Sequence, residues 1–380
     1  MAQSPAGLST NAFALDLHRV LTAQGGQTNL FYSPASIVVA LAMTYLGARG
    51  NTATQMTKTF HFPTDVPEKF HDFLQALNAS NSDGNQILMA NRLFAQMGFE
   101  ILEEFKKASK ESFSAEMALV DYVKNSNGAR DTVNRWVEQK TKDKIKNLIP
   151  EGMFNKDTIL CLVNAVYFKG SWMKHFNRNA TQSGKFKTTP SQEIQVQFLY
   201  QSSEFRYLES STLGCQIVEL PYAGEKLSMV VLLPNEVDGL GKLESSLNKE
   251  TLQEVMTSLR NSHPEEVEVT LPKFTLTQEF SLGETLKGMG ASDLFSPGKA
   301  DLSGISAAPL VVSEVVHKAF VEVNEEGTIA AAATGVWIML MSMPMNPVFY
   351  ANHPFLFLIR HNDTGAVLFM GRLVVPDKDN

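Results

Sequence analysis

Cysteine is scarce in this sequence: its 380 residues include only two, Cys161 and Cys215. So few cysteines exclude the dense disulfide framework of a small secreted scaffold and a cysteine-rich zinc site. Cys161 lies in the apolar run 159–168, where a buried and inert thiol is the usual state. The sequence does not decide whether the two cysteines form a disulfide, so cysteine usage does not identify the cellular compartment.

The chain also lacks a surplus of positive charge. Its 33 Lys and Arg residues are outnumbered by 40 Asp and Glu residues, which gives a net charge of −7. Nucleic acids and anionic membranes attract clustered cations, so neither is expected as a partner. The densest basic stretch, 140–146, is interrupted by Asp143, and such mixed charge is typical of a solvated helix face.

No secretory signal is visible in the first five residues, because no basic region is followed there by an apolar one. Three glycosylation sequons are nevertheless present, at Asn78, Asn179 and Asn362. Sequons favour secretion weakly, since such triplets also arise by chance. We expect a mature extracellular glycoprotein chain to which a start Met has been added.

Motifs of common catalytic sites are missing as well. No serine lies in a nucleophile-elbow pattern, and no two histidines have the spacing of zinc proteases. Gly239, Gly241 and Lys242 resemble part of a phosphate loop, but Leu243 replaces the required Ser or Thr, so a surface turn is the better interpretation. We therefore predict no enzyme, no catalytic residue, no metal and no cofactor, although a triad assembled from distant residues stays open.

The sequence does contain a helical first half and a strand-rich second half. Apolar residues at helical spacing predict one helix near 13–21, another beginning at Ser33 and Pro34, and a third over 131–146. Short apolar or alternating runs predict strands at 159–168, 227–233, 267–271 and 366–375. No linker or repeat divides the chain, so we predict one α+β domain over residues 1–380.

One stretch without any charged residue lies between Glu326 and Arg360. A transmembrane helix is a poor interpretation, because two prolines, Pro344 and Pro347, interrupt a segment that is barely the necessary ~18 residues long. An ordinary core helix or strand is a second interpretation. A third is a segment that is exposed in one state and a buried strand in another.

The third interpretation is favoured by the side chains that would share one face of a strand. Alternate residues from Thr328 to Leu340 begin small and end large, without a single charge. Small residues at the leading end can slip between two existing strands with little rearrangement. The segment therefore has the pattern of a strand that inserts into a sheet.

The residues before this segment, 321–333, read VEVNEEGTIAAAA and resemble the reactive-loop hinge of the serpins. Further serpin motifs recur in the family's order at 29–31, 33–36, 46–52, 134–145, 164–172, 271–274, 301–305, 317–319 and 352–355. The resemblance covers nearly the whole chain. The protein is thus identified as a member of the serpin family, similar to secreted serpins such as those of arthropods.

The resemblance implies a fold with three β-sheets, eight or nine helices and a reactive-centre loop at about 325–347, either exposed or inserted in a sheet. In this family a serine protease attacks the loop, is acylated, and is trapped when the cleaved loop inserts as a new strand. The implied partner is a serine protease, bound covalently 1:1 by a monomeric inhibitor. The alternative is a non-inhibitory serpin that serves as a carrier, chaperone or storage protein.

Three groups of site residues are carried over by matching position. The hinge comprises Glu325, Glu326, Gly327, Thr328, Ile329, Ala330, Ala331, Ala332, Ala333 and Thr334. The shutter, a hydrogen-bonded cluster beneath the strands that open, comprises Ser33, Ser36, Asn164 and His353. The breach, where the loop enters the sheet, comprises Lys273 and Trp172, with Lys273 paired to Glu325. Ile329 departs from the family pattern, in which Glu is frequent, but it is expected on the outer face after insertion.

The family spacing from Glu325 places the cleaved bond between Met341 and Ser342, with Leu340 as the reserve position. An apolar, unbranched bait suits elastase-like, chymotrypsin-like or cathepsin-G-like proteases. Heparin binding is not expected, because the corresponding helical region, 67–78, has no cationic stripe.

Overall fold

The second helix begins at its predicted cap, whereas the first begins before its predicted range of 13–21. Helix α1 spans Pro5–Gly25, and Ser4 caps it by accepting a hydrogen bond from the Gly7 amide. Helix α2 spans Pro34–Tyr45, and its cap Ser33 accepts from the Ser36 amide. Both predicted helices are confirmed.

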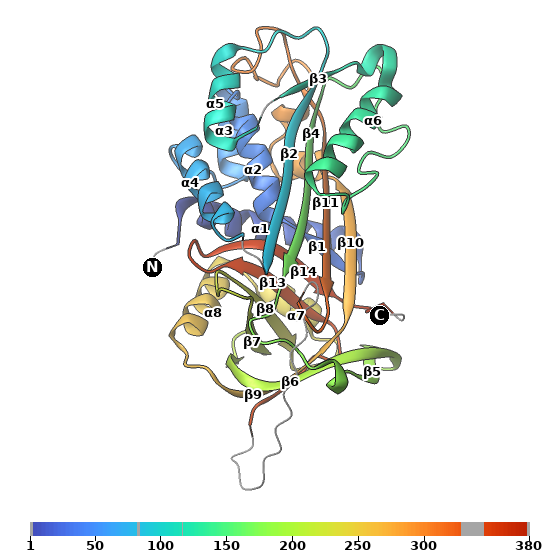
Figure 1. Ribbon diagram of the computed structural model, residues 1–380. Helices are drawn as coiled ribbons and strands as arrows, with labels where there is room; N and C mark the ends of the chain where they lie inside the picture. Colours follow the sequence, from blue (N-terminus) through green and yellow to red (C-terminus); the bar gives the residue numbers. More distant parts are fainter. Residues whose placement is uncertain (1–2, 82–83, 116, 328–345, 378–380) are drawn as a thin grey trace.

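The computed structural model describes residues 3–81, 84–115, 117–327 and 346–377 (Figure 1).

Nine α-helices occur within the described ranges. The others are α3 (Gly50–Thr59), α4 (Val66–Asn78), α5 (Glu103–Phe113), α6 (Tyr122–Lys140), α7 (Leu240–Ser246), α8 (Lys249–Asn261) and α9 (Gly283–Met289). None of the described helices has the length and apolar character needed to cross a bilayer. Helix α6 ends before the predicted 146, because Lys142 and Asp143 adopt left-handed backbone conformations that a helix cannot continue.

Five strands form the central sheet, in the order β10-β11-β4-β2-β3. Their bounds are β2 (Asn85–Gln96), β3 (Ala118–Val120), β4 (Leu160–Gly170), β10 (Phe274–Ser281) and β11 (Val312–Val323). Strands β4 and β11 are direct neighbours and run parallel. The predicted strand 159–168 is thus confirmed as β4, which is buried on both faces.

The remaining strands form a nine-stranded sheet, in the order β1-β14-β13-β8-β7-β6-β9-β12, with β5 attached to β6. Their bounds are β1 (Leu30–Tyr32), β5 (Gln182–Thr189), β6 (Gln192–Ser210), β7 (Cys215–Pro221), β8 (Leu227–Pro234), β9 (Glu265–Pro272), β12 (Val348–Tyr350), β13 (Phe355–His361) and β14 (Ala366–Leu373). Residues 198–205 of β6 pair with β9, and residues 206–210 pair with β7. The long strand β6 therefore joins two parts of this sheet, which with the central sheet correspond to the three expected sheets.

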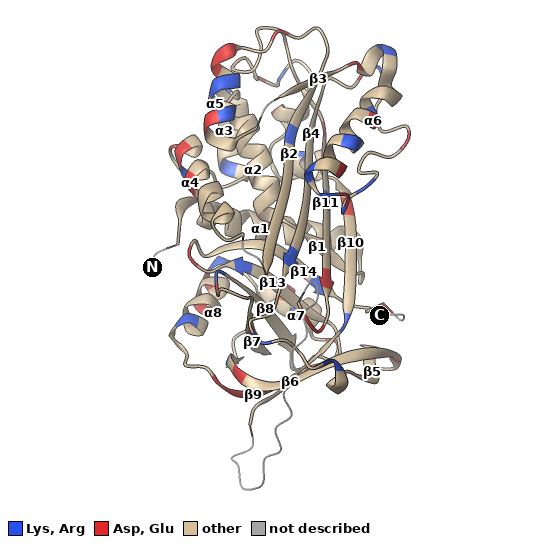
Figure 2. Cartoon of the chain, viewed as in Figure 1, with Lys and Arg blue, Asp and Glu red and all other residues tan. Residues whose placement is uncertain are grey.

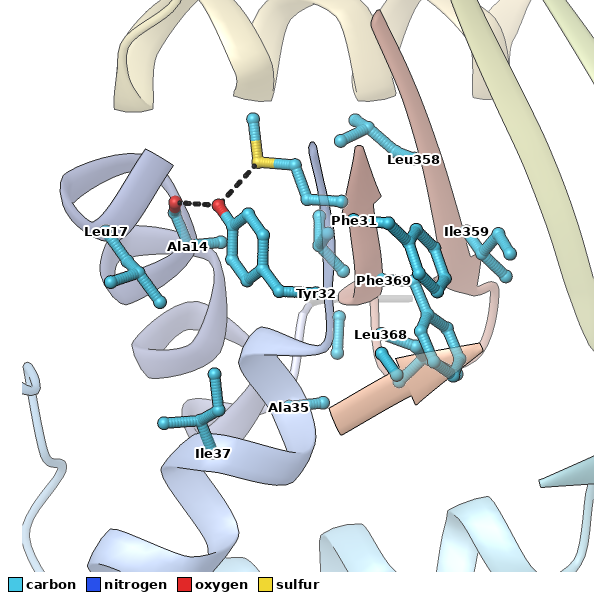
Figure 3. Close-up of a cluster of buried hydrophobic side chains, with 14 of the residues drawn as sticks. Ala14, Leu17, Phe31, Tyr32, Ala35, Ile37, Leu358, Ile359, Leu368 and Phe369 are labelled. Atoms are coloured by element: carbon cyan, nitrogen blue, oxygen red, sulfur yellow. Dashed lines mark hydrogen bonds between the residues drawn. The ribbon is translucent and has the colours of Figure 1, made fainter. Parts of the chain in front are cut away.

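The core between the first helices and the C-terminal strands places β1 and the start of α2 (Figure 3). The Phe31 ring stacks on Phe369 with centroids 5.4 Å apart. The Tyr32 hydroxyl donates a hydrogen bond of 2.8 Å to the Ala14 carbonyl oxygen. These contacts fix the backbone that carries Ser33 toward the central sheet.

The two cysteines are buried free thiols, so no disulfide joins them. Cys161 lies in β4 of the central sheet and Cys215 lies in β7 of the other sheet. Burial raises the pKa of both thiols, that of Cys215 to about 12. Both are therefore protonated and unreactive at neutral pH.

Candidate functional site

The hinge begins just after β11, where two acidic residues are held by ion pairs. The Glu325 carboxylate lies 3.2 Å from the Lys273 ammonium and accepts a hydrogen bond of 2.8 Å from the Thr181 hydroxyl. Glu326 pairs with Arg178. Burial opposes ionisation of Glu325, but hydrogen bonds from its own amide, Thr181 and Lys273 outweigh burial and lower its pKa. Glu325 is thus anchored as an anion.

Gly327 is the last hinge residue within the described part of the chain. Its φ is 100°, and a Cβ at this position would lie 2.1 Å from the Gly170 carbonyl oxygen at the end of β4. Only glycine fits such a conformation and such a close approach. The rest of the predicted hinge and the bait fall outside the described residues: Thr328, Ile329, Ala330, Ala331, Ala332, Ala333, Thr334, Leu340, Met341 and Ser342.

Trp172 lies at the same end of the central sheet and contacts the hinge. Its indole Nε1 donates a hydrogen bond of 3.0 Å to the Asn324 carbonyl oxygen, and its amide donates one of 3.1 Å to the Glu326 carbonyl oxygen. Its ring stacks on Tyr222 with centroids 4.5 Å apart. The two predicted breach residues, Trp172 and Lys273, therefore lie on either side of the segment that leads into the loop.

A second polar cluster lies beneath the middle of the sheet, where α2 meets β4. The Ser33 hydroxyl donates to the Leu368 carbonyl oxygen at 2.7 Å and accepts from the Ser36 amide at 3.1 Å. The Asn164 side-chain nitrogen donates to the Ser36 hydroxyl at 2.6 Å and to the side-chain oxygen of Asn91 in β2. Three of the four predicted shutter residues are thus brought together.

The prediction that His353 belongs to this cluster is wrong, and His317 of β11 takes its place. The Ser33 amide donates to His317 Nε2 at 3.0 Å, so Nδ1 carries the proton and donates to the Asn164 side-chain oxygen. His353 lies after β12, with Nε2 2.8 Å from the Pro234 carbonyl oxygen at the end of β8. Strand register makes the difference, because it places His317 directly opposite Asn164.

Asn91 is a further member that sequence reasoning missed. It lies opposite Asn164 on β2, so Asn91, Asn164 and His317 form one row across three adjacent strands. An isolated Asn in a half-buried strand carries no sequence signal of its own. Alternation from Ile87 along β2 would have placed Asn91 on the inner face, but only the register aligns it with the other two.

The hydrogen bond between Asn164 and His317 crosses the seam between β4 and β11, the point at which a new strand would enter. Adjacent strands lie about 4.8 Å apart, so an inserted strand would double that distance and break the bond. Both strands point toward the loop, so a chain turning back at Gly327 would run antiparallel to each. Insertion would therefore replace one parallel ladder with two antiparallel ones, which are the more stable kind.

Acidification is expected to destabilise the protein through His317. Burial lowers the pKa of His317 from 6.5 to about 3, so this side chain stays neutral in the folded state while the unfolded chain binds a proton below pH 6.5. The stability contributed above pH 6.5 is thus lost as pH falls toward 3, by about 1.4 kcal/mol per pH unit. Urea unfolding at pH 7 and pH 5 measures this loss. A His317→Gln variant should be less stable at pH 7 but less sensitive to pH, and equal pH sensitivity would refute the assignment to His317.

The three sequons differ in accessibility. Asn78 and Asn179 are exposed. Asn362 is half-buried, and its side-chain nitrogen donates a hydrogen bond of 2.7 Å to the Glu225 carbonyl oxygen. The Ser80 and Thr364 hydroxyls of two sequons both contact the buried ring of His361, at 2.7 and 2.8 Å. A structural role thus accounts for those two hydroxyls without a glycan.

No group of three or more His, Cys, Asp or Glu side chains in the described ranges could hold a metal ion. The polar clusters at the breach and at the shutter are instead networks that hold strands in place. Their hydrogen bonds are satisfied in the closed sheet and must be exchanged for others when the sheet opens.

Known proteins share both this sequence and this architecture. A family model described as Serpin (serine protease inhibitor) matches residues 8–376. The human leukocyte elastase inhibitor is 44% identical over 373 residues, covering 96% of this chain and 97% of that protein. The leukocyte elastase inhibitor of Xenopus tropicalis is 41% identical, with coverage of 96% and 97%.

Solved structures agree. Uncleaved ovalbumin superposes with a TM-score of 0.88 at 34% identity, covering 98% of this chain and all of that one. Serpin48 of the insect Tenebrio molitor gives a TM-score of 0.86 at 30% identity, covering 98% of each chain. These matches agree with the shutter at the β4–β11 seam and with the hinge that follows β11. The chain belongs to the serpin family of serine protease inhibitors.

Proposed function

We propose that this serpin inhibits an elastase-like, chymotrypsin-like or cathepsin-G-like protease through a bait at Met341 and Ser342. The protease serine would attack the Met341 carbonyl carbon, the peptide bond to Ser342 would break, and the Ser342 amine would leave with the proton. The resulting ester would link the two proteins 1:1. The names of the leukocyte elastase inhibitors similar to this chain support such a target.

The observation that carries the proposal is the closed but parallel seam between β4 and β11, with the loop beginning at its end. Insertion of about a dozen loop residues would add ladder hydrogen bonds worth roughly 1 kcal/mol each, and more than about 10 kcal/mol in total. Distorting a protease active site costs less, because each oxyanion donor contributes only about 3–4 kcal/mol. Insertion could therefore trap the ester before water cleaves it.

Mixing the protein, which we propose is a monomer, with a pancreatic or neutrophil elastase tests the proposal directly. Electrophoresis in SDS should show a 1:1 complex that survives denaturation, together with a released C-terminal peptide. Cleavage of the loop without any such complex would instead support the alternative of a carrier, chaperone or storage serpin.

We expect heparin to accelerate inhibition by no more than about twofold. Helix α4 carries both signs of charge, with Lys69 paired to Glu68 at 2.7 Å, and so offers no cationic stripe (Figure 2). Lys140 ends α6 and three more lysines follow, but Asp143 interrupts the run. Association rate constants measured with and without heparin check this. A tenfold acceleration that disappears in a Lys142→Glu, Lys146→Glu variant would show that the lysines after α6 form a heparin site.

Mild oxidation is expected to slow inhibition at least about tenfold. A sulfoxide at Met341 is polar and bulkier than the thioether, so it would fit an apolar specificity pocket poorly. Rate constants before and after treatment with hydrogen peroxide measure the effect, with mass spectrometry to locate the added oxygen. A Met341→Leu variant is the control and should keep its rate after the same treatment. Unchanged kinetics of the parent after confirmed oxidation of Met341 would contradict the bait assignment.

We further propose that the chain acts outside the cell. The support is limited to the sequons, of which Asn78 and Asn179 are exposed enough to carry glycans. Expression in a secretory cell line with a leader, followed by glycosidase digestion, tests this. A mass shift at Asn78 or Asn179 supports an extracellular protein, and the absence of glycan at both contradicts it.

A further inference from the structure

A cavity of about 710 Å³ lies beside β2, between that strand and the helices α2, α4, α5 and α6. In Figure 1, α4 and α5 lie on one side of β2 and α6 lies on the other. This volume is within the range of about 300–1,000 Å³ that small-molecule sites occupy. The cavity lies apart from the breach and the reactive loop.

The floor of the cavity is apolar. It is lined by Val39 and Met43 from α2, Leu74 and Leu77 from α4, and Phe113 from α5. These side chains come from three different helices, so they form a pocket rather than a flat patch. An apolar chain of a ligand would be shielded from water there.

The polar side of the cavity presents hydrogen-bond donors. Trp136 and Lys140 line it from α6, and neither side chain makes a hydrogen bond within the described residues. Asn91 lines it from β2. The Asn91 side-chain oxygen accepts from Ser36 and Asn164, and this leaves its amide nitrogen as a donor without a partner among the described residues.

The edge of β2 adds backbone donors to the same place. Strand β3 pairs with β2 only at residues 94–96, so the rest of β2 has a neighbour on one side only within the described chain. The Ile87 amide donates to the Asn81 side chain at 2.7 Å, away from β4. Because backbone groups alternate along a strand, the amides of Met89 and Asn91 point to that same free edge.

An apolar floor, a lysine and several donors without partners match one class of ligand. We propose that this cavity binds an amphipathic carboxylate, such as a fatty acid, and that the bound ligand stabilises the closed β4–β11 seam and slows loop insertion. The carboxylate would accept hydrogen bonds from Asn91 and pair with Lys140, and the alkyl chain would lie on the apolar floor. A polyanion would gain nothing from that floor.

Asn91 provides the coupling to the seam. Its side-chain oxygen accepts from Ser36 at 3.2 Å and from Asn164, which in turn accepts from His317 across the seam. A ligand that fixes the Asn91 side chain would hold Asn164 in the orientation that the His317 bond requires. Opening the seam would then cost more with the ligand bound than without it.

Binding is tested without any protease, by titrating dodecanoate below its critical micelle concentration and following tryptophan fluorescence. Saturable 1:1 binding, a raised melting temperature and no binding of dodecyltrimethylammonium are expected. Trp136→Phe should remove the fluorescence signal but keep the thermal shift. Lys140→Glu should weaken binding at least about fivefold, whereas the matched control Lys142→Glu, an exposed lysine outside the lining, should not.

A Leu74→Trp variant, which fills the cavity, should abolish binding while its circular dichroism matches the parent. The absence of saturable binding in the parent, or unchanged binding in Leu74→Trp, would overturn the site. These measurements do not depend on inhibition, so they stand or fall separately from the proposed function.

The effect on insertion does rest on the proposed function. Dodecanoate at saturation should lower the fraction of protease trapped at least about threefold in favour of cleaved inhibitor, and Leu74→Trp should be insensitive to it. Binding without any change in the trapped fraction would overturn the coupling to the seam. Binding to a protein that never forms a covalent complex would overturn the proposed function and leave the site intact.

Discussion

Trypsin and thrombin should react with this serpin at least about a hundredfold more slowly than the best elastase-like or chymotrypsin-like protease. Trypsin-like enzymes hold an Asp at the base of the specificity pocket and require Arg or Lys in the bait. The chain has neither residue from Thr328 to Ile359. A buried Asp facing Met341 would lose its ion pair, which costs several kcal/mol of transition-state binding.

A panel of proteases, with mass spectrometry of the released peptide, measures the difference. A peptide that begins at Ser342 would support Met341 as the bait, and one that begins at Met341 would support Leu340. The matched variant Met341→Arg should reverse the preference, so that it inhibits trypsin rapidly and elastase slowly. Rapid inhibition of thrombin by the parent protein would overturn the assignment of an apolar bait.

Replacing Thr328 with Arg should convert the inhibitor into a substrate, so that nearly all of it is cleaved and almost none forms a complex. Thr328 follows Gly327 and would be the first side chain to enter the seam on the inner face. An Arg there would have to bury an unpaired charge beneath the sheet, at a cost of several kcal/mol. Insertion would then be slower than hydrolysis of the ester.

The neighbouring position supplies the control. Ile329 is expected on the outer face of the inserted strand, where the family often has Glu, so Ile329→Glu should retain most of the inhibition. The ratio of complex to cleaved inhibitor, read from SDS gels for both variants, compares the two faces. Full inhibition by Thr328→Arg, or equal loss in both variants, would rule out the assumed orientation of the hinge.

Local features of the fold were predictable because they depend on neighbouring residues. The cap at Ser33 and the buried strand β4 follow from side-chain type and spacing within one turn or one strand. The end of α6 was placed too late, because a continuing helical pattern does not reveal that Lys142 and Asp143 adopt left-handed conformations. Boundaries of this kind depend on how the loop packs on the sheet.

The membership of the shutter could not be predicted in full from the sequence. Both His317 and His353 lie in recognisable motifs, and nothing in either motif says which one reaches Asn164. The choice depends on the register of β11 against β4, and a shift of one residue would turn His317 to the opposite face. The partnership of Asn91 with Asn164 was hidden for the same reason.

The sequence by itself determined the family and the α+β class, and it predicts a single domain and an apolar bait, because each depends on residue types at fixed spacing along the chain. Only the tertiary structure decided that β4 and β11 are in contact, that His317 completes the shutter, and that Asn91 also lines a cavity. Those relations join residues far apart in sequence, and they are set by strand register and by the packing of helices from different parts of the chain.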